Sequence, residues 1–319
     1  MGAAALRALS EDADSEVPPN LSLTIADGAA DVTGSALSPA ALAQVVSPER
    51  VLSEELLGLA RAVADRYAGS LADVLQLAVP PRSARAEQRP SPAPLPPPGA
   101  PEAGSWGRYE HGAAFVESLA AGRAPRAVWN ALPVSEWSKE IALAVAATLA
   151  SGLGALVVVP DGRAVARVDT ALTSLLGEGR HAVLTADAGP EKRYREWLAV
   201  RRGSVRAVVG TRAAMFAPVQ DLGLVVIWDD GDDRHSEQHA PQPHAREVLL
   251  LRAAQDKCGF LLGSWSCTVE AAQLVESGWA RPLVAGREQV RVGGALGLPG
   301  GAPGRGGGGG ARGPVGAGA

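Results

Sequence analysis

Two short apolar segments near the middle of the chain constrain its fold most strongly. Residues 205–209 (VRAVV) and 222–228 (LGLVVIW) are rich in β-branched residues, and a polar loop follows each of them directly. Such segments are typical of strands that are buried on both faces of a parallel sheet. Ligands of open α/β sheets bind where the strands end, so we expect the residues after Val209 and after Trp228 to lie at the functional edge.

The surrounding sequence continues this alternation of strands and helices. We predict further strands at residues 155–159, 182–185 and 260–264, and helices at residues 138–150, 164–176, 190–200, 244–255 and 268–276. Strands that alternate with helices in units of about 25 residues predict a parallel sheet with right-handed crossovers and helices on both faces. The uncharged stretch 141–160 has the length of a membrane span, but the break at Ser151 and Gly152 favours helix, turn and strand.

The chain outside this unit divides by composition. Residues 1–41 have no sustained period and are expected to be poorly ordered. Two helices are predicted within residues 42–88, the first capped by Ser53 and the second by Ser70. Residues 89–104 (RPSPAPLPPPGAPEAG) are expected to form an extended, semi-rigid linker before the α/β domain, residues 105–290. The Gly-rich residues 291–319 are expected to be flexible coil.

Charge and cysteine content exclude several classes of protein. The formal net charge of −4 argues against a protein that coats nucleic acid through its overall charge, although a local basic patch remains possible. The two cysteines, Cys258 and Cys267, cannot form a four-cysteine zinc site. The acidic residues that soon follow the N-terminus are not those of a signal peptide. We therefore expect a cytoplasmic protein with no membrane partner.

Four motifs resemble a single family, the replication restart helicases called PriA. They are GTRAAMFAP at 210–218, DLGLVVIWDDGDD at 221–233, PHAREVLLLRA at 243–253 and LLGSWS at 261–266. They resemble the first motor domain of that family, which implies a RecA-like, P-loop helicase fold. Residues 45–81 are similar to the end of the family's domain that recognises the 3′ end of DNA at a fork. The resemblance implies fork structures, single-stranded DNA and replication-restart proteins as partners.

The nucleotide motifs of that family are degenerate in this chain. A P-loop needs glycines to wrap the phosphates and a lysine to reach them. The resemblance aligns the loop with residues 131–138 (ALPVSEWS), which contain no glycine and place Trp137 where the family has its lysine. Tryptophan also replaces the metal-binding aspartate of the second motif. The predicted degenerate crevice consists of Trp137, Ser138, Lys139, Trp228, Asp229, Asp230 and Trp265.

We therefore expect no ATP binding and no catalytic residue, as in the actinobacterial branch of the family, which is regarded as lacking helicase activity. The full-length family also uses zinc, bound by cysteines, and a second motor domain, for which no room remains after Gln289. No cofactor is expected in this chain. The unmatched ends, residues 1–41 and 291–319, suggest the hypothesis of frame-shifted sequence.

An arginine-rich run supplies candidate contacts to DNA, because guanidinium groups bind phosphates. Arg212 is the strongest candidate since it lies in the family loop. The alternative is an exposed helix and loop in an Arg-rich chain. The DNA-binding candidates are Gly210, Thr211, Arg212, Arg201, Arg202 and Arg206, within a run that also includes Arg193 and Arg195.

The sequence carries weaker signals for three further kinds of site. The aspartates at 229, 230, 232 and 233, with His235, His239 and His244, could bind a metal ion, but Pro241 and Pro243 indicate a solvated acidic loop. No metal site is predicted. The tryptophans could stack on nucleobases, although packing of a disused crevice is favoured. Cys267 has no histidine placed to activate it.

Three functions remain open from the sequence. The favoured one is a replication restart and primosome assembly protein that binds DNA at stalled forks and lacks helicase activity. The second is an ATP-dependent 3′–5′ DNA helicase, and the third is an incomplete, non-functional fragment.

Overall fold

A single parallel sheet forms the centre of the molecule. The computed structural model describes residues 47, 49–133, 135–286 and 290, so the predictions for residues 1–41 and 291–319 lie outside the described residues. Within them, seven strands pair in the order β3-β4-β2-β5-β6-β1-β7, and every pair is parallel. The strands are β1 (Arg126–Asn130), β2 (Gly154–Val158), β3 (His181–Leu184), β4 (Ala207–Gly210), β5 (Leu222–Trp228), β6 (Gly259–Ser264) and β7 (Arg281–Leu283).

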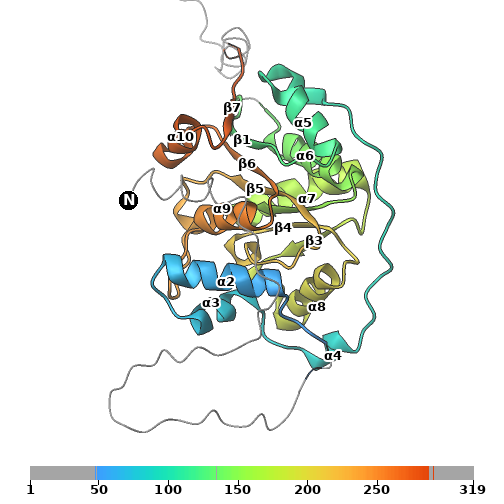
Figure 1. The fold of residues 1–319 in the computed structure, drawn as a ribbon. Coiled ribbons are helices and arrows are strands. Elements are labelled where there is room, and N and C mark those ends of the chain that lie inside the picture. Colours follow the sequence, from blue (N-terminus) through green and yellow to red (C-terminus); the bar gives the residue numbers. More distant parts are fainter. Residues whose placement is uncertain (1–46, 48, 134, 287–289, 291–319) are drawn as a thin grey trace, which may run out of the picture.

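Helices cover both faces of this sheet (Figure 1). One face carries α5 (Gly112–Ala120), α6 (Trp137–Ala150) and α7 (Gly162–Leu176). The other carries α8 (Pro190–Arg201), α9 (Ala245–Gln255) and α10 (Val269–Glu276). Alternation along β2 explains the two layers, because Leu156 and Val158 pack into one core and Ala155 and Val157 into the other. The predicted α/β class, a parallel sheet with helices on both faces, is confirmed.

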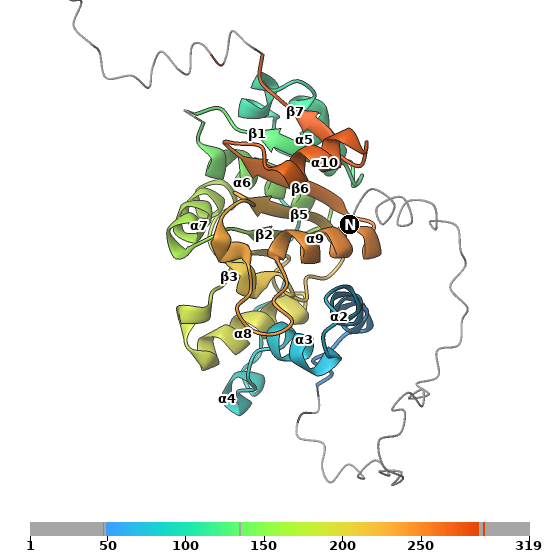
Figure 2. The ribbon, with the colours of Figure 1, turned by 90° about the vertical axis from the view of Figure 1, so that its left-hand side faces the viewer.

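The N-terminal helices belong to the same core as the sheet. They are α2 (Glu54–Arg66), α3 (Leu71–Ala78) and the short α4 (Ala84–Glu87). The predicted caps are present: Ser53 Oγ accepts from the amide of Leu56 at 3.2 Å, and Ser70 Oγ accepts from the amide of Asp73 at 3.1 Å. The apolar side of α2 packs against α9. The two helices lie next to each other in Figure 1 and in Figure 2. The assignment of residues 42–88 to a separate domain that binds the 3′ end of DNA stays a prediction.

The proline-rich segment runs along the outside of the sheet domain without helix or strand up to Gly104, where a 3₁₀ turn begins (Figure 1). Arg180 donates to the carbonyl of Pro96, and Arg202 Nη1 donates to the carbonyl of Arg89 at 3.0 Å. Arg202 also holds Glu49 through Nη2 at 2.7 Å. These bonds fasten the segment to the loops that precede β3 and β4, and its role as a linker between domains stays a prediction.

Two strands were missed from the sequence, β1 and β7. The first has only three apolar residues between Arg126 and Asn130, and the second is a three-residue edge strand that contains Pro282. The stretch 141–160 divides into α6 and β2, as expected. Among the described residues, no helix has both the length and the apolar character needed to cross a bilayer.

Candidate functional site

The predicted nucleotide motifs meet at the carboxyl edge of the sheet. Trp137 begins α6 after the loop that follows β1, Trp228 is the last residue of β5, and Trp265 directly follows β6. Since β5, β6 and β1 are neighbours in the sheet and run parallel, their carboxyl ends lie together. The strand that was missed, β1, is thus the one that brings Trp137 to the other two tryptophans.

The indole rings fill the space between these strand ends. The rings of Trp137 and Trp228 stack with centroids 4.3 Å apart and an interplanar angle of 5°. Trp265 meets Trp228 edge-on at 5.2 Å, and Trp129 packs on Trp228 at 5.4 Å. The exposed fractions are 4% for Trp137 and 2% for Trp228, against 50% for Trp265. Burial of the first two rings favours packing over base stacking, and only Trp265 offers a ring to solvent.

Ser138 and Lys139 face away from these rings. Both line a groove between α6 and α7, together with Ala142, Arg167 and Leu175. Lys139 Nζ also makes an exposed ion pair with Glu136 at 2.7 Å. The lysine, predicted as part of the crevice, is therefore directed to another part of the surface. The residues present do not fit the phosphates of ATP, because a buried ring occupies the lysine position and no glycine lines the loop.

The two carboxylates after Trp228 have different surroundings. Asp230 is buried and accepts from Arg246 Nη1 at 2.8 Å and from Thr268 Oγ1 at 2.8 Å. Burial alone would lower the pKa of Arg246, but the bond and charge of Asp230 outweigh it and raise that pKa. Asp229 is partly exposed, with a φ of 58° and a 3.4 Å hydrogen bond from Ser264. Asp230 therefore links β5 to α9 and α10.

The histidines considered as metal ligands differ in burial and in their hydrogen-bond partners. His235 is buried with Nε2 2.9 Å from the carbonyl of Trp228, whereas His239 is exposed and bound to Glu237. Burial lowers the pKa of His235 and lowers that of His244 to about 4. In the part of the chain that the structure describes, no three His, Cys, Asp or Glu side chains are grouped to hold a metal ion.

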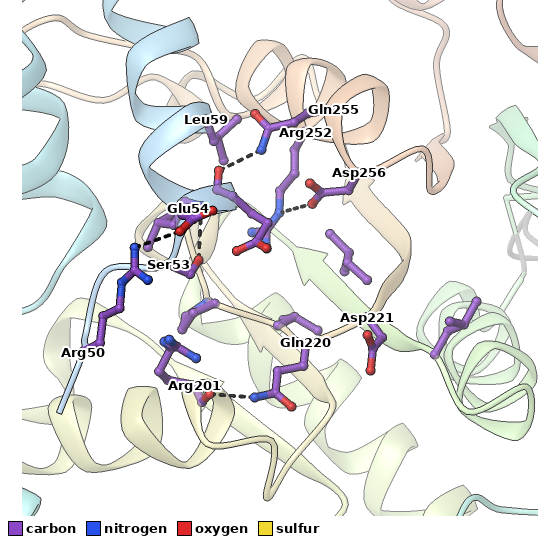
Figure 3. Close-up of a pocket in the computed structure, with 16 residues that line it drawn as sticks. Arg50, Ser53, Glu54, Leu59, Arg201, Gln220, Asp221, Arg252, Gln255 and Asp256 are labelled. Atoms are coloured by element: carbon purple, nitrogen blue, oxygen red, sulfur yellow. Dashed lines mark hydrogen bonds and ion pairs between the residues drawn. The ribbon is translucent and has the colours of Figure 1, made fainter. Parts of the chain in front are cut away.

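The arginine run is split between opposite edges of the sheet. Arg201 ends α8 and Arg206 precedes β4, so both lie at the amino edge with Arg202. Arg206 is paired with Asp221 at 3.2 Å. Arg201 lines a cavity of about 830 Å³ beside α2, where its carbonyl accepts from Gln220 (Figure 3). The structure does not bring these residues to the crevice, and their contact with DNA stays a prediction.

Gly210 is the last residue of β4, and Thr211 and Arg212 follow it at the carboxyl edge. A Cβ on Gly210 would come within 2.1 Å of the carbonyl oxygen of Leu184, so glycine allows β3 and β4 to approach here. Arg212 Nε donates to Glu237 at 3.0 Å. Sequence reasoning missed Glu237, Arg246 and Thr268 as partners of the predicted residues, and the only signal for them was their place in or near the family-like motifs.

The geometry defines an α/β protein with one parallel sheet, helices on both faces and tryptophans packed at the carboxyl edge of the sheet. No protein-family model matches the chain. The probable replication restart protein PriA of Mycobacterium tuberculosis is 49% identical over 251 residues, which is 78% of this chain and 38% of the relative. That of Mycobacterium leprae is 46% identical over 254 residues, 78% of this chain and 39% of the relative.

The chain belongs to the PriA replication restart family, and it spans about two fifths of the length of these relatives. The PriA of Bacillus subtilis is 32% identical over 130 residues, 41% of this chain and 16% of the relative. Two solved structures are distant at 13% identity. RecG bound to a three-way DNA junction has a TM-score of 0.40, and the match covers 72% of this chain and 29% of the RecG chain. The C-terminal domain of S. cerevisiae Dbp5 has a TM-score of 0.37, and the match covers 54% of this chain and 96% of the Dbp5 chain.

Proposed function

We propose that this chain acts in replication restart by binding DNA at fork structures, without hydrolysing ATP and without unwinding DNA. Membership of the PriA family supports the restart role. Arginines at the carboxyl edge, Arg212 and Arg193 among them, supply groups that bind phosphate. Replication-restart proteins are the proposed partners, and the cytoplasm the proposed location.

The stacking of Trp137 on Trp228 carries the proposal. A P-loop binds phosphate through backbone amides that converge on an open space and through a lysine. Here two buried rings take that space with their centroids 4.3 Å apart. ATP binding would have to separate the rings and expose them, and each tryptophan buries roughly 150–250 Å². The indole rings carry no charge that could pair with the phosphates of the nucleotide.

The helicase alternative is weakened by a second observation. An ATPase needs a carboxylate in its second motif that is free to act on water or metal. Asp230 accepts bonds from Arg246 and Thr268 and is 1% exposed, so it is engaged in holding two helices. Asp229 is more open but has a left-handed backbone conformation and faces Ser264.

The test combines phosphate release with DNA binding on the same purified chain. We expect no release of phosphate from ATP and Mg²⁺ above the buffer rate, with or without a model fork. We expect binding of a fluorescent fork that weakens about ten-fold or more between 50 and 200 mM salt, because phosphate contacts release counterions. DNA-stimulated phosphate release would establish the helicase alternative, and absence of any fork binding would favour the non-functional fragment.

A further inference from the structure

The loop between β5 and α9, residues 229–244, folds back over the ends of neighbouring strands. Arg212, which follows β4, is held by Glu237 of this loop at 3.0 Å. Asp161, which follows β2 and caps α7, is paired with Arg234 of the same loop. A backbone bond of 3.0 Å from Glu237 N to the Pro243 carbonyl closes the loop on itself. The loop thus places carboxylates and arginines together at the carboxyl edge.

Glu237 occupies a position built to hold an anion. Its Oε1 accepts from the amides of Gln238 at 2.8 Å and His239 at 3.1 Å, and lies 2.8 Å from His239 Nδ1. Its Oε2 accepts from Arg212 Nε at 3.0 Å. Burial would raise the pKa of Glu237, but the bonds from His239 and Arg212 outweigh it and lower that pKa to about 2.

A second arginine lies in the field of the same carboxylate. Arg193, in the first turns of α8, is half-buried, and its guanidinium has no hydrogen-bond or ion-pair partner among the described residues. Burial lowers the pKa of Arg193, and the charge of Glu237 acts in the opposite direction. An arginine that is partly desolvated and unpaired favours the approach of a further anion.

We propose that Arg212 is a phosphate-binding residue for single-stranded DNA, and that Glu237 occupies Arg212 until a DNA phosphate displaces it. The inference rests on the proposed DNA-binding function and adds its regulation. A phosphate oxygen carries the same sign of charge as the carboxylate and accepts the same bond from Arg212. Displacement is local, because Gln238, His239 and Ala240 of the loop are exposed. The loop therefore lowers the affinity of the site for DNA.

Four variants of the full chain test this by fluorescence anisotropy with a labelled single-stranded oligonucleotide. Glu237→Gln keeps the size and a hydrogen-bonding oxygen but removes the charge, and we expect it to bind about ten-fold more tightly, since the charge-assisted bond to Arg212 is weakened. Asp233→Asn removes the same charge from the same loop. Asp233 is exposed and has no side-chain partner among the residues described, so little change is expected.

A double-mutant cycle is completed by Arg212→Ala and the double variant Arg212→Ala/Glu237→Gln. If Glu237 acts by occupying Arg212, the gain from Glu237→Gln disappears in the Arg212→Ala background. Thermal melting of each variant confirms that it is folded. An equal gain from Asp233→Asn, or a gain that persists without Arg212, would show only an effect of net charge and would overturn the inference.

The two levels of failure are distinct. If the wild-type chain binds the oligonucleotide and Glu237→Gln binds no better, Glu237 does not compete with DNA and only the present inference fails. If neither the wild type nor any variant binds DNA, the proposed function fails as well.

Discussion

Replacing Trp228 with alanine is expected to lower the free energy of unfolding by about 3–5 kcal/mol, the range for loss of a buried large aromatic residue. Trp228 is 2% exposed and touches Trp137, Trp129 and Trp265. Its removal leaves a cavity between the ends of the strands and exposes the face of Trp137. Urea denaturation followed by circular dichroism measures the change. The urea concentrations at half unfolding are compared with the same dependence of free energy on urea concentration for both proteins.

Trp265→Ala is the matched control, because it removes the same side chain from the same cluster at a position that is 50% exposed. We expect a loss of about 1 kcal/mol, the size of an aromatic pair contact. Similar losses for both variants would mean that Trp228 is not the centre of a packed cluster. The account of a filled crevice would then be wrong.

Replacing Asp230 with alanine is expected to destabilise the fold by about 3 kcal/mol, because it removes the buried partner of Arg246 and leaves only the longer ion pairs with Glu247 and Glu270. Arg246 is 7% exposed and Asp230 is 1% exposed, so water cannot replace the lost carboxylate readily. The hydroxyl of Thr268 at the start of α10 loses an acceptor too. The measurement is again urea denaturation at neutral pH.

Asp229→Asn provides the control at the neighbouring position. Asparagine tolerates the φ of 58°, and the side chain of Asp229 makes one weak bond of 3.4 Å, so we expect a change within about 0.5 kcal/mol. A large loss at Asp229 with little loss at Asp230 would reverse the assignment. Asp229 would then be the structural residue, and Asp230 would remain a candidate for catalysis.

The sequence predicted the sheet class because the buried strands are the most apolar parts of the chain. β5 is buried along its whole length, and its predicted limits are those observed. β1 was missed because Arg126 and Asn130 at its ends shorten its apolar run to three residues. Short strands flanked by polar residues carry too little period for a pattern to be read.

The site could be predicted in part, since its residues follow strands that the pattern identified. Trp228 and Trp265 follow directly from the ends of β5 and β6. The partners across the sheet could not be predicted, because they depend on loop conformation. Glu237 reaches Arg212 only because the loop turns back over β2, and Gly69 lies so close to Pro241 that a Cβ would come within 2.4 Å. Such contacts join residues far apart in the chain.

The arginine-rich run also shows why positions in a sequence do not predict positions on the surface. Arg206 and Arg212 are close in sequence but lie on either side of β4, at opposite edges of the sheet. A cluster of charges in a sequence becomes a patch only if the chain does not cross the molecule between them. Here a strand of four residues is enough to separate them.

Thermal melting of the chain with increasing ATP and Mg²⁺ tests the central claim most directly, because a ligand that binds only the folded state stabilises it by about 2.7 kcal/mol at one hundred times its Kd. With Trp137 stacked on Trp228, the melting temperature is predicted to stay constant up to millimolar ATP. A rise in melting temperature that increases with ATP concentration and requires Mg²⁺ would contradict the account and show that a nucleotide enters the crevice.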